Sequence, residues 1–140
     1  MRFRFRELPD PGRQDGVGAR PIVDIVVDGL EHAPQAALLD SGATAIRFGV
    51  YLAELCGIDL SDAPEARLAV GGGLVTARMA EVDLTVTDQR DSHRWTAPVW
   101  FCDPWTPAFG LLGLTGFFDH FDVTISSYEE RIELTPVNAR

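Results

Sequence analysis

Leu38-Leu39-Asp40-Ser41-Gly42-Ala43-Thr44 is the stretch of this chain that decides its interpretation. Two apolar residues run directly into an acidic residue and a turn. Asp and Ser side chains hydrogen-bond to nearby backbone in turns, and glycine adopts backbone angles that other residues avoid. An apolar strand that delivers one carboxylate into such a turn indicates a candidate catalytic acid at Asp40. An ordinary surface turn of the same composition is the alternative.

A second apolar, glycine-containing stretch lies some seventy residues further on, Gly110-Leu111-Leu112-Gly113-Leu114-Thr115-Gly116-Phe117-Phe118-Asp119-His120-Phe121. In order and spacing, the two stretches together resemble the retropepsin-like (retroviral-type) aspartic proteases, in particular bacterial single-domain members. The first resembles their active-site turn, two hydrophobic residues followed by Asp-Thr/Ser-Gly-Ala/Ser. The second resembles the element that packs beside that turn, here Leu111, Leu112 and Gly113. The resemblance covers roughly residues 21–134.

This resemblance implies an aspartic endopeptidase whose catalytic residue is Asp40, with the active-site turn completed by Ser41, Gly42 and Ala43. It implies no metal and no cofactor. The chemistry needs two carboxyl groups that share one proton, one acting as base and the other as acid. The motif occurs once in this chain. The second carboxylate is therefore expected from a second copy of the chain across a two-fold axis, which predicts a homodimer.

Three consecutive glycines mark another candidate part of the site. The stretch 68–76 predicts two strands that meet at a glycine tip. By its position between a predicted helix and an alternating strand, this hairpin resembles the flap of the family, which closes over an extended peptide substrate. The residues assigned to flap and substrate binding are Val70, Gly71, Gly72, Gly73 and Leu74. A hairpin that is simply flexible is the alternative.

The pattern of the whole chain predicts an all-β domain. Apolar and polar residues alternate with the period of a strand in several short segments, the clearest of which is 80–87. A helix is expected over 48–56, ended by Gly57, and a second short helix after Gly113. The expected fold class, which the resemblance also implies, is a closed barrel of six to eight strands with a glycine-tipped flap hairpin and one or two short helices.

Two parts of the chain are distinguished by the resemblance. Residues 21–136 are expected to form the retropepsin-like protease domain, and residues 1–20 an N-terminal strand and loop that is a candidate dimer arm. In the retropepsins the termini interleave at the dimer interface. The arginines of this arm would then face acidic residues of the last strand, at Glu129 and Glu133. Leu114 stands where the retroviral enzymes have an arginine near the dimer contact, so that contact is expected to differ here.

Composition excludes several classes of function. A chain of 140 residues with 46% hydrophobic and 24% charged residues is expected to be one globular domain. Its net charge of −9 disfavours nucleic acid and anionic membranes, and neither is expected as a partner. No apolar run has the length of a membrane span, and residues 1–7 lack the apolar core of a secretory signal, which makes the cytoplasm the expected location. Cys56 and Cys102 are expected to be free thiols.

Two further interpretations stay open beside a homodimeric aspartic endopeptidase acting on extended peptides. The chain could keep the retropepsin fold as a catalytically inactive peptide-binding or scaffold domain, because a fold does not guarantee an activity. It could also be a monomeric β-barrel in which the Asp-Ser-Gly-Ala pattern is coincidental. An intact carboxylate at the end of an apolar strand favours the enzyme over both.

Overall fold

The structure is a computed structural model and describes residues 1–137. Its elements, in chain order, are β1 (Arg2–Arg4), β2 (Arg6–Pro9), β3 (Val17–Arg20), β4 (Ile22–Val27), β5 (Gln35–Leu39), β6 (Ile46–Gly49), α1 (Val50–Cys56), β7 (Glu65–Val70), β8 (Gly73–Thr87), β9 (Ser92–Asp103), β10 (Gly110–Leu112), β11 (Phe121–Ser126) and β12 (Arg131–Pro136). Strands dominate, as the alternating sequence pattern predicts.

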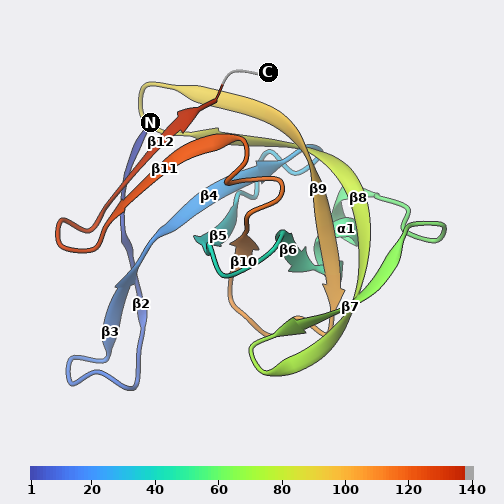
Figure 1. Ribbon diagram of the computed structural model, residues 1–140, viewed down its shortest axis with the longest axis horizontal. Helices are drawn as coiled ribbons and strands as arrows, with labels where there is room; N and C mark the ends of the chain where they lie inside the picture. The colour runs from blue at the N-terminus through green and yellow to red at the C-terminus, as the bar shows by residue number, and fades with distance from the viewer. Residues whose placement is uncertain (138–140) are drawn as a thin grey trace.

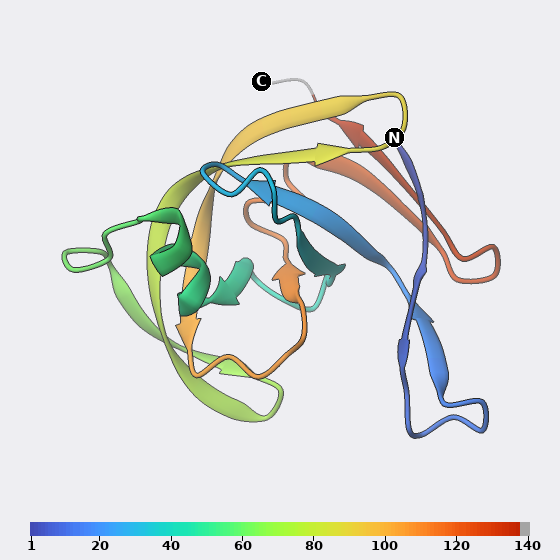
Figure 2. The ribbon, with the colours of Figure 1, turned by 180° about the vertical axis from the view of Figure 1, so that it is seen from behind.

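Six of the strands close into a barrel. They follow the order β4-β5-β10-β6-β9-β8, and β8 pairs again with β4, so this part of the sheet has no free edge (Figure 1). Apolar side chains fill the interior, and the largest fully buried ones are those of Phe48, Phe101 and Phe117. Helix α1 lies outside the barrel, where it contacts β6 and β9 (Figure 2). The all-β closed barrel expected from the sequence is confirmed.

Strand β10 carries the second motif into the centre of the barrel sheet. It runs parallel to β5, with Leu112 opposite Leu39, and antiparallel to β6 on its other side. Immediately after it, Gly113 passes against the loop that joins β5 and β6. A Cβ atom at Gly113 would lie 2.4 Å from the Ala45 carbonyl oxygen and 2.6 Å from that of Ala43. Only glycine allows this close approach of the two backbones.

The predicted glycine-tipped hairpin is present as β7 and β8. Val70 pairs with Gly73, and the two residues between them, Gly71 and Gly72, have φ angles of 57° and 83°. A two-residue turn with positive φ at both central positions is the type I′ hairpin, which glycine favours. Beneath the hairpin lies a second small apolar cluster, built around Val75, Ala77 and Cys102 and separate from the barrel core.

The N-terminal strand pairs within its own chain. Strand β1 lies antiparallel to β12, with Arg2 opposite Glu133, and the two side chains form an ion pair at 3.3 Å. The sequence predicted this match of basic and acidic residues as a contact between protomers, whereas here it forms inside one chain. The loop expected within residues 1–20 is the turn of a hairpin, β2–β3, that projects from the barrel (Figures 1 and 2).

One of the two expected helices is absent from the described residues. Helix α1 ends where predicted, with Gly57 in the left-handed conformation at φ 70°. The segment after Gly113, by contrast, forms successive turns. Gly116 has a φ of 100°, outside the helical range, and its N–H donates to the Asp119 carboxylate at 2.9 Å. These local bonds replace the hydrogen-bond ladder of a helix.

Replacing Gly113 with alanine tests the close approach. The new methyl group would collide with two backbone oxygens, which cannot move without displacing the loop after β5. We expect Gly113→Ala to lower the free energy of unfolding by about 3 kcal/mol, the upper end of the usual range for overpacking. Urea unfolding followed by tryptophan fluorescence measures the change.

Gly73→Ala is the matched control for this substitution. A Cβ atom at Gly73 would meet its nearest neighbour, the Val70 carbonyl oxygen, at 3.7 Å, an ordinary contact. Its unfolding free energy is expected to stay within about 0.5 kcal/mol of the parent protein. An equal decrease in the free energy of unfolding for the two variants would show that the contact at Gly113 imposes no special constraint.

The two thiols should differ in reactivity, because only the thiolate attacks a disulfide reagent. Both cysteines are free, Cys102 buried and Cys56 half-buried, and burial raises the pKa of Cys102 to about 11. With Ellman's reagent at pH 8, we expect Cys102 to react only after denaturation. The native Cys56→Ser variant should therefore show no fast-reacting thiol, and a fast reaction there would contradict the burial of Cys102.

Candidate active site

Asp40 stands at the point where buried strand β5 leaves the barrel. Its backbone N–H donates to the Leu112 carbonyl oxygen at 3.0 Å, and its own carbonyl oxygen accepts from Ala43 N–H at 3.0 Å. The Gly42 N–H donates to Asp40 Oδ1 at 2.9 Å. One backbone N–H thus bonds the carboxylate of this half-buried residue, and two further hydrogen bonds hold its main chain.

The second motif supports the rest of the turn from behind. The Leu114 N–H donates to the Ala43 carbonyl oxygen at 3.0 Å, and the Thr115 N–H donates to that of Thr44 at 3.0 Å. Ala43 is buried against this support, while Ser41 and Thr44 are exposed. The two stretches singled out in the sequence therefore meet in space, with Leu112 and Gly113 directly beside the Asp40 turn.

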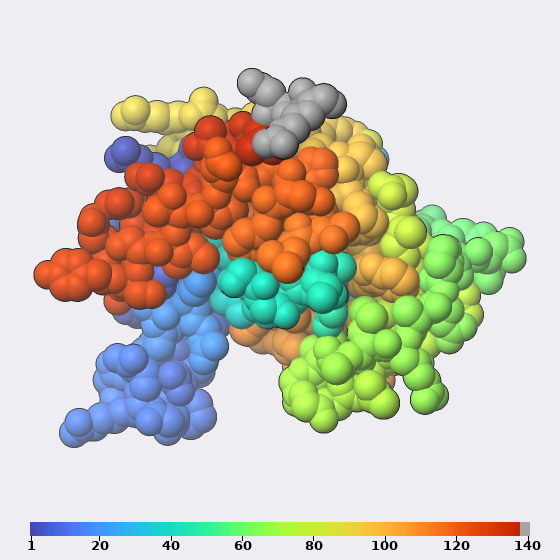
Figure 3. Space-filling model, in the orientation of Figure 1, coloured from blue at the N-terminus to red at the C-terminus, as the bar shows by residue number. Residues whose placement is uncertain are grey.

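The turn lies at the surface of the molecule. In Figure 3 the turquoise surface near residue 40 is visible between the orange segment that follows β9 and the yellow-green hairpin β7–β8. The tip of this hairpin is exposed, and Leu74 beside it keeps 67% of its surface accessible. All five residues assigned to the flap thus lie on one hairpin, but the structure brings none of them into hydrogen-bond contact with Asp40.

A buried arginine joins the turn to this hairpin. The Arg47 side chain, on β6, donates from Nη1 to the Ala69 carbonyl oxygen at 2.8 Å and from Nη2 to Thr44 Oγ1 at 3.1 Å. Arg47 is only 8% exposed. Its positive charge opposes the rise in the pKa of Cys102 that burial causes, which places it near that thiol. Sequence reasoning missed Arg47, although an arginine inside the apolar run 45–50 was a signal.

Within the described chain, Asp40 has no acidic partner. No hydrogen bond or ion pair among residues 1–137 joins its carboxylate to another carboxyl group. Nor do these residues contain a group of three or more His, Cys, Asp or Glu side chains arranged to hold a metal ion. One copy of the site therefore offers one carboxylate and no metal ligand set.

A large hollow of about 1060 Å³ lies elsewhere on the molecule. It is lined by the N-terminal strand and by the turns that join β8 to β9 and β11 to β12, and Asp40 is not among its lining residues. Charged side chains of both signs border it. Separately, none of the helices in the described residues has the length and apolar character needed to cross a membrane.

Comparison with solved structures identifies the fold. A retropepsin-like aspartic protease from Rickettsia conorii matches with a TM-score of 0.58 and 15% sequence identity, over 96% of this chain and 89% of that one. The retroviral protease-like domain of Ddi1 from Leishmania major matches with a TM-score of 0.54 and 17% identity, over 85% of this chain and 90% of that one.

Comparisons at the level of sequence found nothing: no protein-family model matches the chain, and neither does any curated protein. The assignment therefore depends on three-dimensional architecture. The six-stranded barrel, the β10 strand that supports the Asp40 turn, and the two structural likenesses agree in one conclusion: the chain has the fold of the retropepsin-like aspartic proteases.

Proposed function

We propose that this chain is an aspartic endopeptidase that acts as a homodimer, with one Asp40 from each protomer. The observation that carries the proposal is the setting of Asp40, a half-buried residue. Its carboxylate accepts the Gly42 N–H, its backbone N–H donates to the Leu112 carbonyl oxygen, and no acidic partner lies beside it among residues 1–137. A two-fold axis beside the turn would supply that partner, because a symmetric dimer presents the same residue twice.

The chemistry follows from two adjacent carboxyl groups that share one proton. Two carboxyl groups about 3 Å apart cannot both be ionised, because their negative charges repel each other. The ionised carboxylate would take a proton from a water molecule, whose oxygen attacks the peptide carbonyl carbon. The protonated carboxyl group would donate to the carbonyl oxygen, and a proton then passes to the leaving nitrogen as the C–N bond breaks. No metal or cofactor is needed for any of these steps.

The hairpin β7–β8 would act as the flap in this mechanism. A peptide substrate would lie extended between the hairpin and the Asp40 turn, where an exposed tip with two positive-φ glycines can close over it and exclude water. Extended peptides are recognised through their backbone and through alternate side chains. A cytoplasmic location, and partners limited to peptide and a second copy of the chain, complete the proposal.

An exposed apolar side chain beside the turn supports a dimer contact there. Leu114 is 47% exposed, and its N–H bonds to the Ala43 carbonyl oxygen. An apolar residue at this position, where the sequence departs from the retroviral arginine, suits a contact made by packing rather than by ion pairs. The role of residues 1–20 as a dimer arm remains a prediction, since β1 pairs within its own chain.

Asp40→Asn tests the catalytic role. The asparagine oxygen can still accept the Gly42 N–H, so the turn should keep its structure, but the amide cannot accept the proton of water. We expect cleavage of a proteome-derived peptide library between pH 4 and 7 to fall by at least about 100-fold. Mass spectrometry of the products measures it.

Asp122→Asn, an exposed position on β11, makes the same chemical change away from the site and serves as control. It should retain full activity. Equal cleavage by Asp40→Asn and the parent protein would refute the proposal. Peptide binding without any cleavage, from a confirmed dimer, would instead favour the inactive peptide-binding domain.

Leu114→Glu tests the dimer contact. A carboxylate from each protomer would be brought to the same apolar contact, where burial of charge is costly. We expect the variant to sediment as a folded monomer at concentrations where the parent protein is a dimer, and to lose activity with it. Leu55→Glu, at a 63% exposed position on α1, is the control and should leave the dimer intact. An unchanged dimer in Leu114→Glu would exclude this contact.

A further inference from the structure

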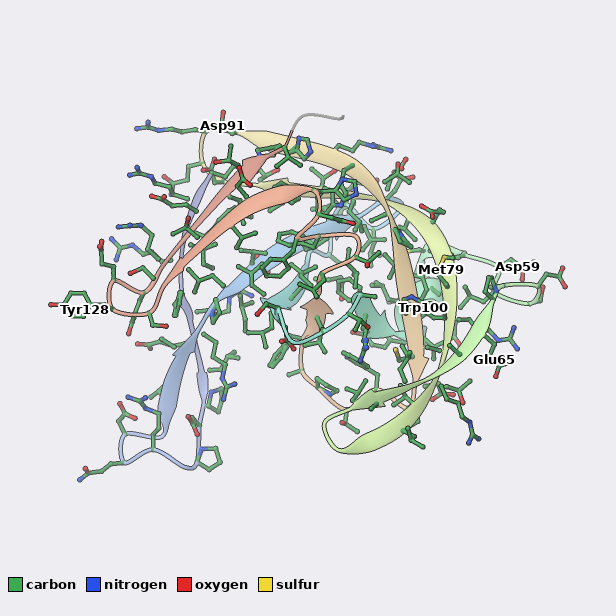
Figure 4. All side chains as sticks on the ribbon, viewed as in Figure 1. Asp59, Glu65, Met79, Asp91, Trp100 and Tyr128 are labelled. Carbon is green, nitrogen blue, oxygen red and sulfur yellow. The ribbon has the colours of Figure 1, made fainter. Side chains whose placement is uncertain are left out.

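Arg47 is a buried cation on a strand of the barrel. All of strand β6 is buried, and Arg47 lies opposite Leu111 on β10 and Trp100 on β9 in the sheet. Figure 4 labels Trp100 on its strand, near the hairpin β7–β8. Among residues 1–137, no Asp or Glu comes within ion-pair distance of the guanidinium. A buried charge without a counter-ion is energetically costly.

The guanidinium also has hydrogen-bond donors to spare. It carries five N–H groups, of which the structure pairs one at Nη1 with Ala69 and one at Nη2 with Thr44. Both acceptors are neutral oxygens. Nε is buried and has no partner in the described chain. A further acceptor, preferably a charged one, would satisfy both the unpaired donor and the unpaired charge.

The position of these donors relates them to the path of a substrate. Thr44 ends the Asp40 turn, and Ala69 lies on β7 of the hairpin that we propose as the flap. The guanidinium therefore sits where the two walls of the proposed cleft meet. When the flap opens, the bond to Ala69 would separate, and the guanidinium would become accessible from the cleft.

We propose that Arg47 binds a carboxylate of the substrate peptide close to the scissile bond. This inference rests on the proposed function and specifies its substrate class: peptides with an acidic side chain, or a free C-terminus, at one defined position. The planar guanidinium can bind a carboxylate through two parallel N–H···O hydrogen bonds. A Gln side chain in the substrate has no negative charge and cannot replace the carboxylate in this pair. Arg47 is then a specificity-determining residue.

The experiment compares matched peptides. A cleavable sequence is synthesised with Glu or Gln at each position around the scissile bond, and with a free or an amidated C-terminus, and kcat/KM is measured at pH 6, where an unperturbed Glu is ionised. We expect one position at which the carboxylate raises kcat/KM by roughly tenfold to hundredfold, as a charge-assisted hydrogen bond would. The comparison of free and amidated peptides distinguishes recognition of a side-chain carboxylate from recognition of a C-terminal carboxylate.

Variants assign the preference to Arg47. Arg47→Met should reduce the Glu-to-Gln ratio at that position to near one, and Arg47→Lys, which keeps the charge but loses the fork, should give an intermediate ratio. Arg20→Met removes the same charge from an exposed position on β3 and should leave the ratio unchanged. An arginine that merely ties the flap to the turn would instead alter kcat/KM equally for both peptides.

The inference fails if the parent protein cleaves the Glu and the Gln peptides equally and also makes no distinction between a free and an amidated C-terminus. It fails too if a preference for the carboxylate persists in Arg47→Met. If the protein cleaves no peptide, the proposed function fails, but the carboxylate site at Arg47 can still be tested. Binding of the same peptides to Asp40→Asn, measured by fluorescence anisotropy, needs no turnover. Tighter binding of the acidic peptide that disappears in Asp40→Asn/Arg47→Met would support the carboxylate site even in a chain that cleaves nothing.

Discussion

The contact between the backbone after β10 and the Asp40 turn is the constraint on which the site depends. Asp40, Ala43 and Thr44 each bond to the segment 112–115, and Gly113 has no room for a side chain. The segment itself is held because β10 lies between β5 and β6 inside a closed sheet. The position of the Asp40 carboxylate thus follows from closure of the barrel. The contacts that transmit this constraint are between backbone groups, which do not move when side chains change rotamer.

The hairpin β7–β8, which we propose as the flap, is connected to the Asp40 turn by different means. It has its own small apolar cluster around Val75, Ala77 and Cys102, apart from the barrel core, and its link to the turn runs through the side chain of Arg47. Side-chain bonds and a small cluster open at lower free-energy cost than a barrel core. The Asp40 turn is therefore held more firmly than the tip of this hairpin.

The parts of the fold that the sequence predicted have strong local causes. The Asp-Ser-Gly turn, the type I′ glycines of the hairpin and the cap at Gly57 each need particular residues. The missed features depend on partners distant in sequence. Strand β3 was not predicted because its four residues, Val-Gly-Ala-Arg, carry no clear strand pattern and the strand is formed by pairing with β2. The helix expected after Gly113 is incompatible with the positive φ of Gly116. Arg47 looked ordinary because burial on β6 is set by β9 and β10.

Closure of the barrel within one chain has a consequence for how such a protein would be controlled. The apolar core, whose residues run from Val23 to Leu134, is formed by one chain. A single subunit therefore does not need a second copy to close its barrel. In a protease that needs two carboxylates from two such subunits, dilution would switch off catalysis without unfolding anything. Activity at low concentration would rise with the square of the amount of protein, so expression level alone would act as a threshold.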